Sequence, residues 1–275
     1  MTQIAERPVT IITGAGRGIG RETATVMAER DYHVVAVSRT EAEIQSLVAE
    51  LKAAKVPPPL AIRCDVSKAD DVAGMIREVI GRFSRIDALI NNAGITGPRA
   101  SLEDITPAEW DTVLAVNVSG SANCARAALP MLKSSRGTIV NVIGGKIGWK
   151  GIPDDETAYI SSKFALWGLT ESLASELKST GVRVNGVSPG PVDTLLARQF
   201  VRSEGATEKR VGFTSELAAR AIAFLASEES APLTGKIVSA RWDNLTEIAA
   251  NGEQLNQQCT FTLRRIDGRN FNVLE

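Results

Sequence analysis

Short uncharged apolar runs alternate with longer amphipathic stretches along most of the chain. The first run, Val9-Thr10-Ile11-Ile12, is typical of a strand buried on both faces of a parallel sheet. The pattern predicts strands at residues 9–12, 33–38, 60–64, 88–90, 138–142, 182–187 and 236–238. It predicts helices ending near residue 30 and at 41–55, 70–83, 107–132, 157–179 and 215–227. Such alternation indicates an α/β fold with one doubly wound parallel sheet flanked by helices on both faces.

A glycine-rich segment follows the first predicted strand and leads into the first predicted helix. Glycines at this place let the backbone approach a pyrophosphate at a helix N-terminus, where free N–H groups and the helix dipole favour negative charge. Glycine clusters also form ordinary turns, but the position between a strand and a helix favours a dinucleotide site. The residues expected to bind the cofactor here are Thr13, Gly14, Gly16, Arg17, Gly18, Ile19 and Gly20.

The end of the second strand indicates which dinucleotide is bound. An NAD site usually has an acidic residue there to bind the ribose 2′-hydroxyl, whereas this chain has Ser38 and Arg39. Arg39 and Arg17 could meet a 2′-phosphate from two sides, because a guanidinium suits an anionic oxygen cluster. Either arginine alone is equally consistent with a solvated side chain. Together, with the acid absent, they favour NADP over NAD.

Small and polar residues follow two further strands. Asp65 comes directly after residues 60–64, and Asn91-Asn92-Ala93-Gly94 ends the strand at 88–90. Ligands of open α/β sheets bind at the carboxyl ends of the strands, so these residues are expected beside the cofactor. The alternative for Asn91-Asn92-Ala93-Gly94 is a polar turn.

Tyr159 and Lys163 are four residues apart in the predicted helix 157–179, which places them on one helix face. A phenol has an ordinary pKa near 10, and a nearby ammonium group would lower it. Tyr159 could then exchange a proton near neutral pH. The spacing alone also fits a surface helix with a coincidental Tyr and Lys.

Charge and cysteine content exclude several other classes. The 275 residues carry a formal charge of -1, which gives no reason to expect nucleic acid or an anionic membrane as a partner. No apolar run approaches a membrane span and the first residues are polar, so a cytoplasmic protein is expected. Cys64, Cys124 and Cys259 are expected to be free thiols. With His33 as the single histidine, neither a histidine-based metal site nor a Ser-His-Asp triad is expected, and no metal is predicted.

Five motifs stand in one order along residues 8–240. They are Thr13-Gly14-x-x-x-Gly18-x-Gly20, Asp65-Val66, Asn91-Asn92-Ala93-Gly94, Tyr159-x-x-x-Lys163 and Pro189-Gly190-x-x-x-Thr194. The series resembles the short-chain dehydrogenase/reductase family. The resemblance implies a single Rossmann-type domain, a nicotinamide cofactor and hydride transfer to or from a carbon–oxygen centre.

The resemblance also implies roles for individual residues. Asn117 falls inside a predicted helix, a poor position for asparagine on propensity grounds. It is either a satisfied structural residue or, as the resemblance implies, the link from the lysine to solvent in a proton relay. The resemblance further assigns the cofactor to Val66, Asn92, Ala93, Gly94, Tyr159, Lys163, Pro189, Gly190, Val192 and Thr194, besides Ser38, Arg39 and Asp65. It implies dimer contacts by helices 107–132 and 157–179, hence a homodimer or homotetramer.

One family residue is missing. The resemblance predicts a serine after the strand 138–142 that hydrogen-bonds the substrate oxygen, but no Ser or Thr occurs from Val142 to Glu156. Forward alignment puts the position at Gly144, and counting back from the tyrosine puts it at 145–147. A backbone N–H of the Gly144-Gly145 turn, the Lys146 side chain or a substrate group could replace the hydroxyl. Gly144, Gly145, Lys146, Trp149 and Leu195 are the candidate substrate contacts.

These observations predict an NADP(H)-dependent oxidoreductase that interconverts a carbonyl and a secondary alcohol, with Tyr159 as the general acid or base. The substrate is expected to be small and polar, such as a sugar, a cyclitol or a secondary-metabolite intermediate. The alternatives are an epimerase or dehydratase that regenerates its cofactor, and a non-catalytic NADP(H) sensor. Residues 1–240 are expected to form the domain, and 241–275 an extension that packs on it or on a neighbouring subunit.

Overall fold

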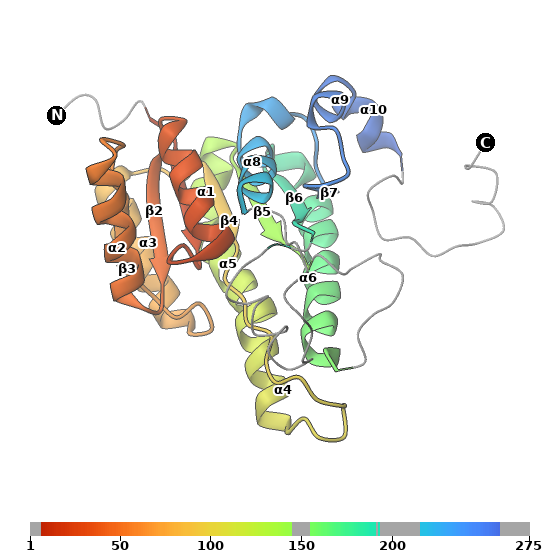
Figure 1. Ribbon diagram of the computed structural model, residues 1–275. Helices are drawn as coiled ribbons and strands as arrows, with labels where there is room; N and C mark the ends of the chain where they lie inside the picture. The colour runs from red at the N-terminus through yellow and green to blue at the C-terminus, as the bar shows by residue number, and fades with distance from the viewer. Residues whose placement is uncertain (1–6, 145–154, 191, 193–214, 259–275) are drawn as a thin grey trace.

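The computed structural model of the chain describes residues 7–144, 155–190, 192 and 215–258. In this part the strands form a seven-stranded parallel sheet in the order β3-β2-β1-β4-β5-β6-β7 (Figure 1). The strands are β1 (Val9–Thr13), β2 (His33–Ser38), β3 (Leu60–Arg63), β4 (Ala88–Asn91), β5 (Thr138–Val142), β6 (Arg183–Ser188) and β7 (Ile237–Ser239). The order reverses between β1 and β4, and ligands of open α/β sheets bind at such a reversal.

Helices cover both faces of the sheet. One face packs against α1 (Gly18–Glu29), α2 (Glu41–Ala53) and α8 (Ser215–Ala226). The other packs against α3 (Ala69–Phe83), α5 (Gly120–Ser135) and α6 (Thr157–Glu176). The predicted fold class, a Rossmann-type doubly wound parallel sheet, is therefore confirmed.

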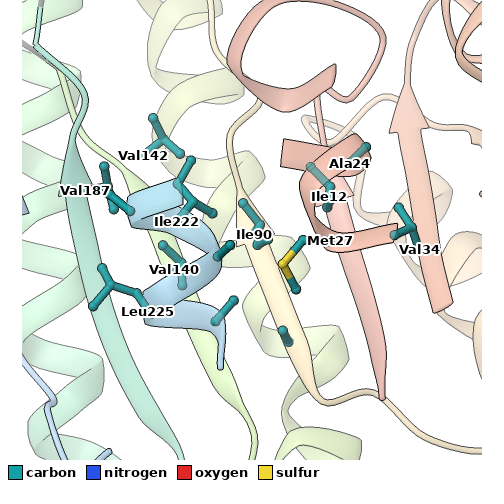
Figure 2. Close-up of a cluster of buried hydrophobic side chains, with 14 of the residues drawn as sticks. Ile12, Ala24, Met27, Val34, Ile90, Val140, Val142, Val187, Ile222 and Leu225 are labelled. Atoms are coloured by element: carbon teal, nitrogen blue, oxygen red, sulfur yellow. The ribbon is translucent and has the colours of Figure 1, made fainter. Parts of the chain in front are cut away.

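The core follows from the two-residue period of the strands. Val9 and Ile11 point into the layer of α3 and α5, whereas Ile12 points into the layer of α1 and α8. Figure 2 shows the second layer, where Ile222 and Leu225 of α8 lie over the middle strands. Both faces are buried, which explains why the strands read as continuous apolar runs.

The long predicted helix at 107–132 is divided into three parts. It consists of α4 (Pro107–Leu114), a π-helical turn at Ala115–Ser119 and α5. The other predicted helices and strands in the described residues are present, with ends shifted by no more than three residues. Wider turns inside α-helices are frequent at functional sites, and this one contains Asn117.

Beyond β7 the chain forms two short helices, α9 (Leu245–Ala250) and α10 (Gly252–Gln257). Ile248 is buried in the core cluster of α8, and Leu245 and Leu255 pack against that cluster. Cys259 lies outside the described residues. The domain boundary at residue 240 stays a prediction.

Two expected absences concern the described residues alone. There, no helix has both the length and the apolar character required to cross a bilayer. The same residues bring together no group of three His, Cys, Asp or Glu side chains that could hold a metal ion.

Candidate active site

A cavity of about 170 Å³ lies at the carboxyl ends of β1, β2 and β4. Its lining includes ten residues that the sequence assigned to the cofactor, namely Gly14, Arg17, Gly18, Ile19, Ser38, Arg39, Val66, Asn92, Ala93 and Gly94. Six further lining residues were not predicted: Val37, Thr40, Glu43, Cys64, Ile95 and Val116. Cys64 is a free buried thiol, as expected, and the same holds for Cys124.

At two positions, Gly14 and Gly20, the backbone path of the loop leaves no room for a side chain. Gly14 has φ +66°, and a Cβ there would lie 2.9 Å from the Cα of Ala93. A Cβ on Gly20 would lie 2.3 Å from the carbonyl oxygen of Gly14. Helix α1 therefore begins directly against the loop, with its N-terminal N–H groups and dipole at the cavity that Gly18 lines.

Thr13 stabilises the loop through its buried hydroxyl group. It is 1% exposed, and its hydroxyl accepts hydrogen bonds from the N–H groups of Asn92 and Ala93, each at 3.0 Å. The Asn92 amide in turn donates to the carbonyl of Thr13 at 2.9 Å. The buried hydroxyl of Thr13 thus joins the ends of β1 and β4, so the structure places Thr13 behind the cavity rather than in its lining.

The end of the cavity beside β2 contains both predicted arginines and one carboxylate. Arg17 and Arg39 line it together with Ser38 and Glu43. Glu43, from the first turn of α2, has Oε1 3.9 Å from Nη1 of Arg17. The sequence indicated no role for Glu43, although it is the third residue of the helix that follows the diagnostic strand.

Arg21, which the sequence also did not single out, joins the glycine loop to α2. Its guanidinium donates to the carbonyls of Gly16 and Glu43 at 3.2 and 3.3 Å. It also bonds the Ser46 hydroxyl at 3.3 Å and pairs with Glu50. These contacts fix the start of α2 relative to the loop.

Asp65 lies at the carboxyl edge of β3, as predicted. Burial alone would raise the pKa of its carboxyl group, but hydrogen bonds from the Ser67 side chain and N–H, and the charges of Arg39 and Lys68, lower that pKa overall. Asp65 therefore stays ionised and adds negative charge close to Arg39.

Tyr159 and Lys163 are neighbours on α6, and Lys163 approaches the cavity at Gly94. Lys163 is 4% exposed, and its ammonium donates to the carbonyl of Val142 at 2.9 Å. The same nitrogen lies 5.7 Å from the centre of the Tyr159 ring. It is also 3.5 Å from the position that a Cβ on Gly94 would take, and Gly94 lines the cavity. The ammonium of Lys163 is therefore next to the part of the cavity that Gly94 lines.

The prediction that the pKa of Tyr159 is lowered by Lys163 is wrong for the protein without a ligand. Burial raises the pKa of the Tyr159 phenol above its ordinary value, and the charge of Glu156 raises it further. Burial also lowers the pKa of Lys163 to about 8, so its ammonium loses the proton at a lower pH than an exposed lysine does. Desolvation of both partners therefore outweighs their attraction.

Glu156 stands one turn before Tyr159, at the N-cap position of α6, and is 2% exposed. It lies 4.0 Å from Nη2 of Arg99. Arg99 forms a two-point ion pair with Asp155, with both N–O distances at 2.8 Å. These contacts tie the loop after β4 to the beginning of α6.

Asn117 is fully buried inside the π-helical turn. Its side chain accepts from the N–H of Ile95 at 2.8 Å and donates to the carbonyl of Ile95 at 2.8 Å. It also donates to Ser162, whose hydroxyl donates to the carbonyl of Tyr159 at 2.6 Å. Asn117 is therefore a satisfied structural residue in this arrangement, and its role in a proton relay stays a prediction.

Gly144 is where the missing serine is expected. A Cβ on Gly144 would lie 3.6 Å from the Tyr159 hydroxyl and 3.2 Å from Cγ of Lys163. The alternative positions Gly145 and Lys146 lie outside the described residues, as do Trp149, Thr194 and Leu195. Gly190 and Val192 are described, the first with φ +73° and the second 6% exposed.

The parallel sheet, the glycine loop before α1 and the Tyr-Lys pair define a dinucleotide-binding α/β enzyme. Residues 8–205 match the family model described as short chain dehydrogenase. The chain belongs to this family and is an oxidoreductase.

Two relatives extend the match beyond these residues. The chain is 35% identical over 236 residues to a 3-oxoacyl-[acyl-carrier-protein] reductase, FabG, of Staphylococcus aureus, with 83% of this chain and 94% of the relative covered. It is 36% identical over 248 residues to the short-chain reductase protein NovJ of Streptomyces niveus, with 86% and 93% covered.

Two solved structures share the fold. The structure of ElxO with NADP bound matches with a TM-score of 0.75 at 27% identity, covering 85% of this chain and 97% of that one. A 3-ketoacyl-(acyl-carrier-protein) reductase from Brucella melitensis complexed with NADH matches with a TM-score of 0.76 at 28% identity, covering 86% and 97%. Both NADP and NADH thus occur in structures similar to this one.

Proposed function

We propose that the chain is an NADP(H)-dependent oxidoreductase that interconverts a ketone and a secondary alcohol on a small polar substrate. The observation that carries this proposal is the position of the Lys163 ammonium against Gly94 of the cavity lining, with the Tyr159 ring 5.7 Å from that ammonium. The cavity fits a dinucleotide because side chains at Gly14 and Gly20 would clash with the loop, and because Arg17 and Arg39 offer positive charge at one end.

A bound nicotinamide would supply the hydride that the carbonyl carbon takes up in the reduction. Tyr159 donates its phenol proton to the carbonyl oxygen, which becomes the hydroxyl group of the product. The phenol carries its proton at neutral pH, and its raised pKa makes it a weaker donor until the bound cofactor and substrate change its surroundings. Lys163 is held by the carbonyl of Val142 and can bind ribose hydroxyls beside Gly94.

The test is consumption of NADPH, followed at the absorbance of the reduced nicotinamide while ketones are offered one at a time. The panel contains sugars, cyclitols and secondary-metabolite ketones, and a 3-oxoacyl thioester because relatives are named for that substrate. The control is Tyr159→Phe, which should bind NADPH as the wild type does and lose at least about 10²-fold in turnover. Equal turnover by this variant would refute the proposed role of the phenol.

The two alternatives give different results in the same assay. A sensor binds NADPH tightly but consumes none with any substrate, and the missing serine is the observation in its favour. An epimerase or dehydratase converts its substrate without net loss of NADPH. Assembly into a homodimer or homotetramer and a location in the cytoplasm stay predictions.

A further inference from the structure

The carboxylate of Glu43 already binds two of the groups that a 2′-phosphate would use. Its Oε1 lies 3.9 Å from Arg17, and its Oε2 accepts a hydrogen bond of 3.4 Å from the Ser38 hydroxyl. All three residues line the cavity. The sequence showed the arginines but not this opposing charge.

Glu43 is held at this place by its backbone and by close packing. Its N–H donates to the carbonyl of Thr40 at 3.2 Å, and its carbonyl accepts from Arg21 at 3.3 Å. A Cβ on Gly16 would lie 2.6 Å from both Cβ and Oε2 of Glu43. Gly16 therefore makes room for the glutamate, and the start of α2 cannot move away without breaking the contacts of Arg21.

The two cofactors place different groups in front of this carboxylate. A phosphate monoester carries about −1.5 to −2 charges at neutral pH, so it repels Glu43 and competes with it for Arg17. A ribose 2′-hydroxyl is neutral and can donate a hydrogen bond to a carboxylate. The same residue thus opposes NADP and can accept NAD.

We propose that Glu43 sets the preference between the two cofactors, by weakening the binding of NADP relative to NAD against the attraction of Arg17 and Arg39. The inference rests on the proposed function, because it concerns the same cofactor cavity. The Glu43 side chain is 31% exposed, so water screens the repulsion and we expect an effect of roughly tenfold rather than many orders of magnitude.

The experiment measures the dissociation constants of NADP⁺ and NAD⁺ by titration calorimetry, for the wild type and for Glu43→Gln. Glutamine keeps the shape that packs on Gly16 and removes the charge. The matched control is Glu41→Gln, which removes the same charge from the same helical turn at an exposed residue outside the cavity lining. We expect Glu43→Gln to tighten NADP⁺ binding roughly tenfold relative to NAD⁺, and Glu41→Gln to leave the ratio within about twofold.

Three results would overturn the inference. An unchanged ratio in Glu43→Gln would show that the carboxylate moves out of the way without cost. An equal change in Glu41→Gln would assign the effect to the general charge of α2. If the wild type bound neither nucleotide, the proposed function would fail together with the inference, whereas the first two results leave that function intact.

Discussion

Replacing Gly144 tests whether the loop after β5 lacks a hydrogen-bond donor for the substrate oxygen. Gly144 is not one of the described glycines with a positive φ, so its backbone conformation accepts a side chain. The new Cβ would lie 3.2 Å from Cγ of Lys163, which must shift slightly, and we expect a cost of about 1 kcal/mol in both Gly144→Ala and Gly144→Ser. The alanine variant is therefore the matched control for crowding.

The serine hydroxyl is the single difference between the two variants. The Cβ position is 3.6 Å from the Tyr159 hydroxyl, so an oxygen attached to it can reach both that phenol and a substrate oxygen bound by it. One donor at a developing oxyanion contributes about 10²–10³ in rate in evolved sites. Since this loop did not evolve around a serine, we expect a smaller gain of about tenfold or more in kcat/KM for Gly144→Ser over Gly144→Ala.

The assay is NADPH consumption with a simple ketone that has no polar group beside the carbonyl, because such a group could itself replace the hydroxyl. Thermal unfolding of both variants checks that the crowding cost is shared. Equal kcat/KM values would refute the reasoning, and would show that another donor already serves the substrate oxygen.

Three further predictions follow from the same contacts. The folded-state pKa of Lys163 is about 8 against an ordinary 10.5, so between pH 8 and 10.5 the unfolded chain binds more protons than the folded one. The free energy of unfolding of the wild type relative to Lys163→Met should therefore rise with pH across that window, by up to about 3 kcal/mol in denaturant titrations. In Gly20→Ala, the added Cβ would lie 2.3 Å from the Gly14 carbonyl, so calorimetry should show cofactor binding weakened at least about tenfold, and unchanged binding would contradict the fitted loop. Ser162→Ala removes the link between Asn117 and the Tyr159 carbonyl and should lower kcat several-fold with little change in KM, at a cost of about 1 kcal/mol in stability; a change in KM alone would argue against this link.

The sequence predicted the sheet and its helices well because period and composition carry that information directly. Buried strands read as apolar runs, and the glycine loop marks where β1 turns into α1. It could not predict the π-helical turn at Ala115–Ser119, because this turn depends on the bonds that Asn117 makes with Ile95, a residue far from it in the sequence. Local propensity indicated an unsuitable asparagine but not the widened helix that holds it.

The sequence predicted the positions of the site residues better than their electrostatics. It placed Lys163 beside Tyr159, and the structure brings them together. The sign of the pKa shift was wrong because it depends on desolvation, and desolvation depends on how α6 packs against β5 and the loop after β4. Spacing along a helix predicts which side chains are neighbours, but not how deeply they are buried.

The two carboxylates that the sequence did not single out, Glu43 and Glu156, have a common property. Each stands near a residue that we propose contacts the cofactor or the substrate. Glu43 lies against Arg17 and Glu156 near Tyr159, and each opposes the charge that this residue would offer or take up. A motif identifies the groups that touch a ligand, whereas these glutamates act on those groups through space. The acidity of the phenol therefore depends on burial first and on Glu156 second, and we expect Glu43 to act in the same way on the affinity for a 2′-phosphate. Removing either charge should change one property without moving the ligand-contacting atoms.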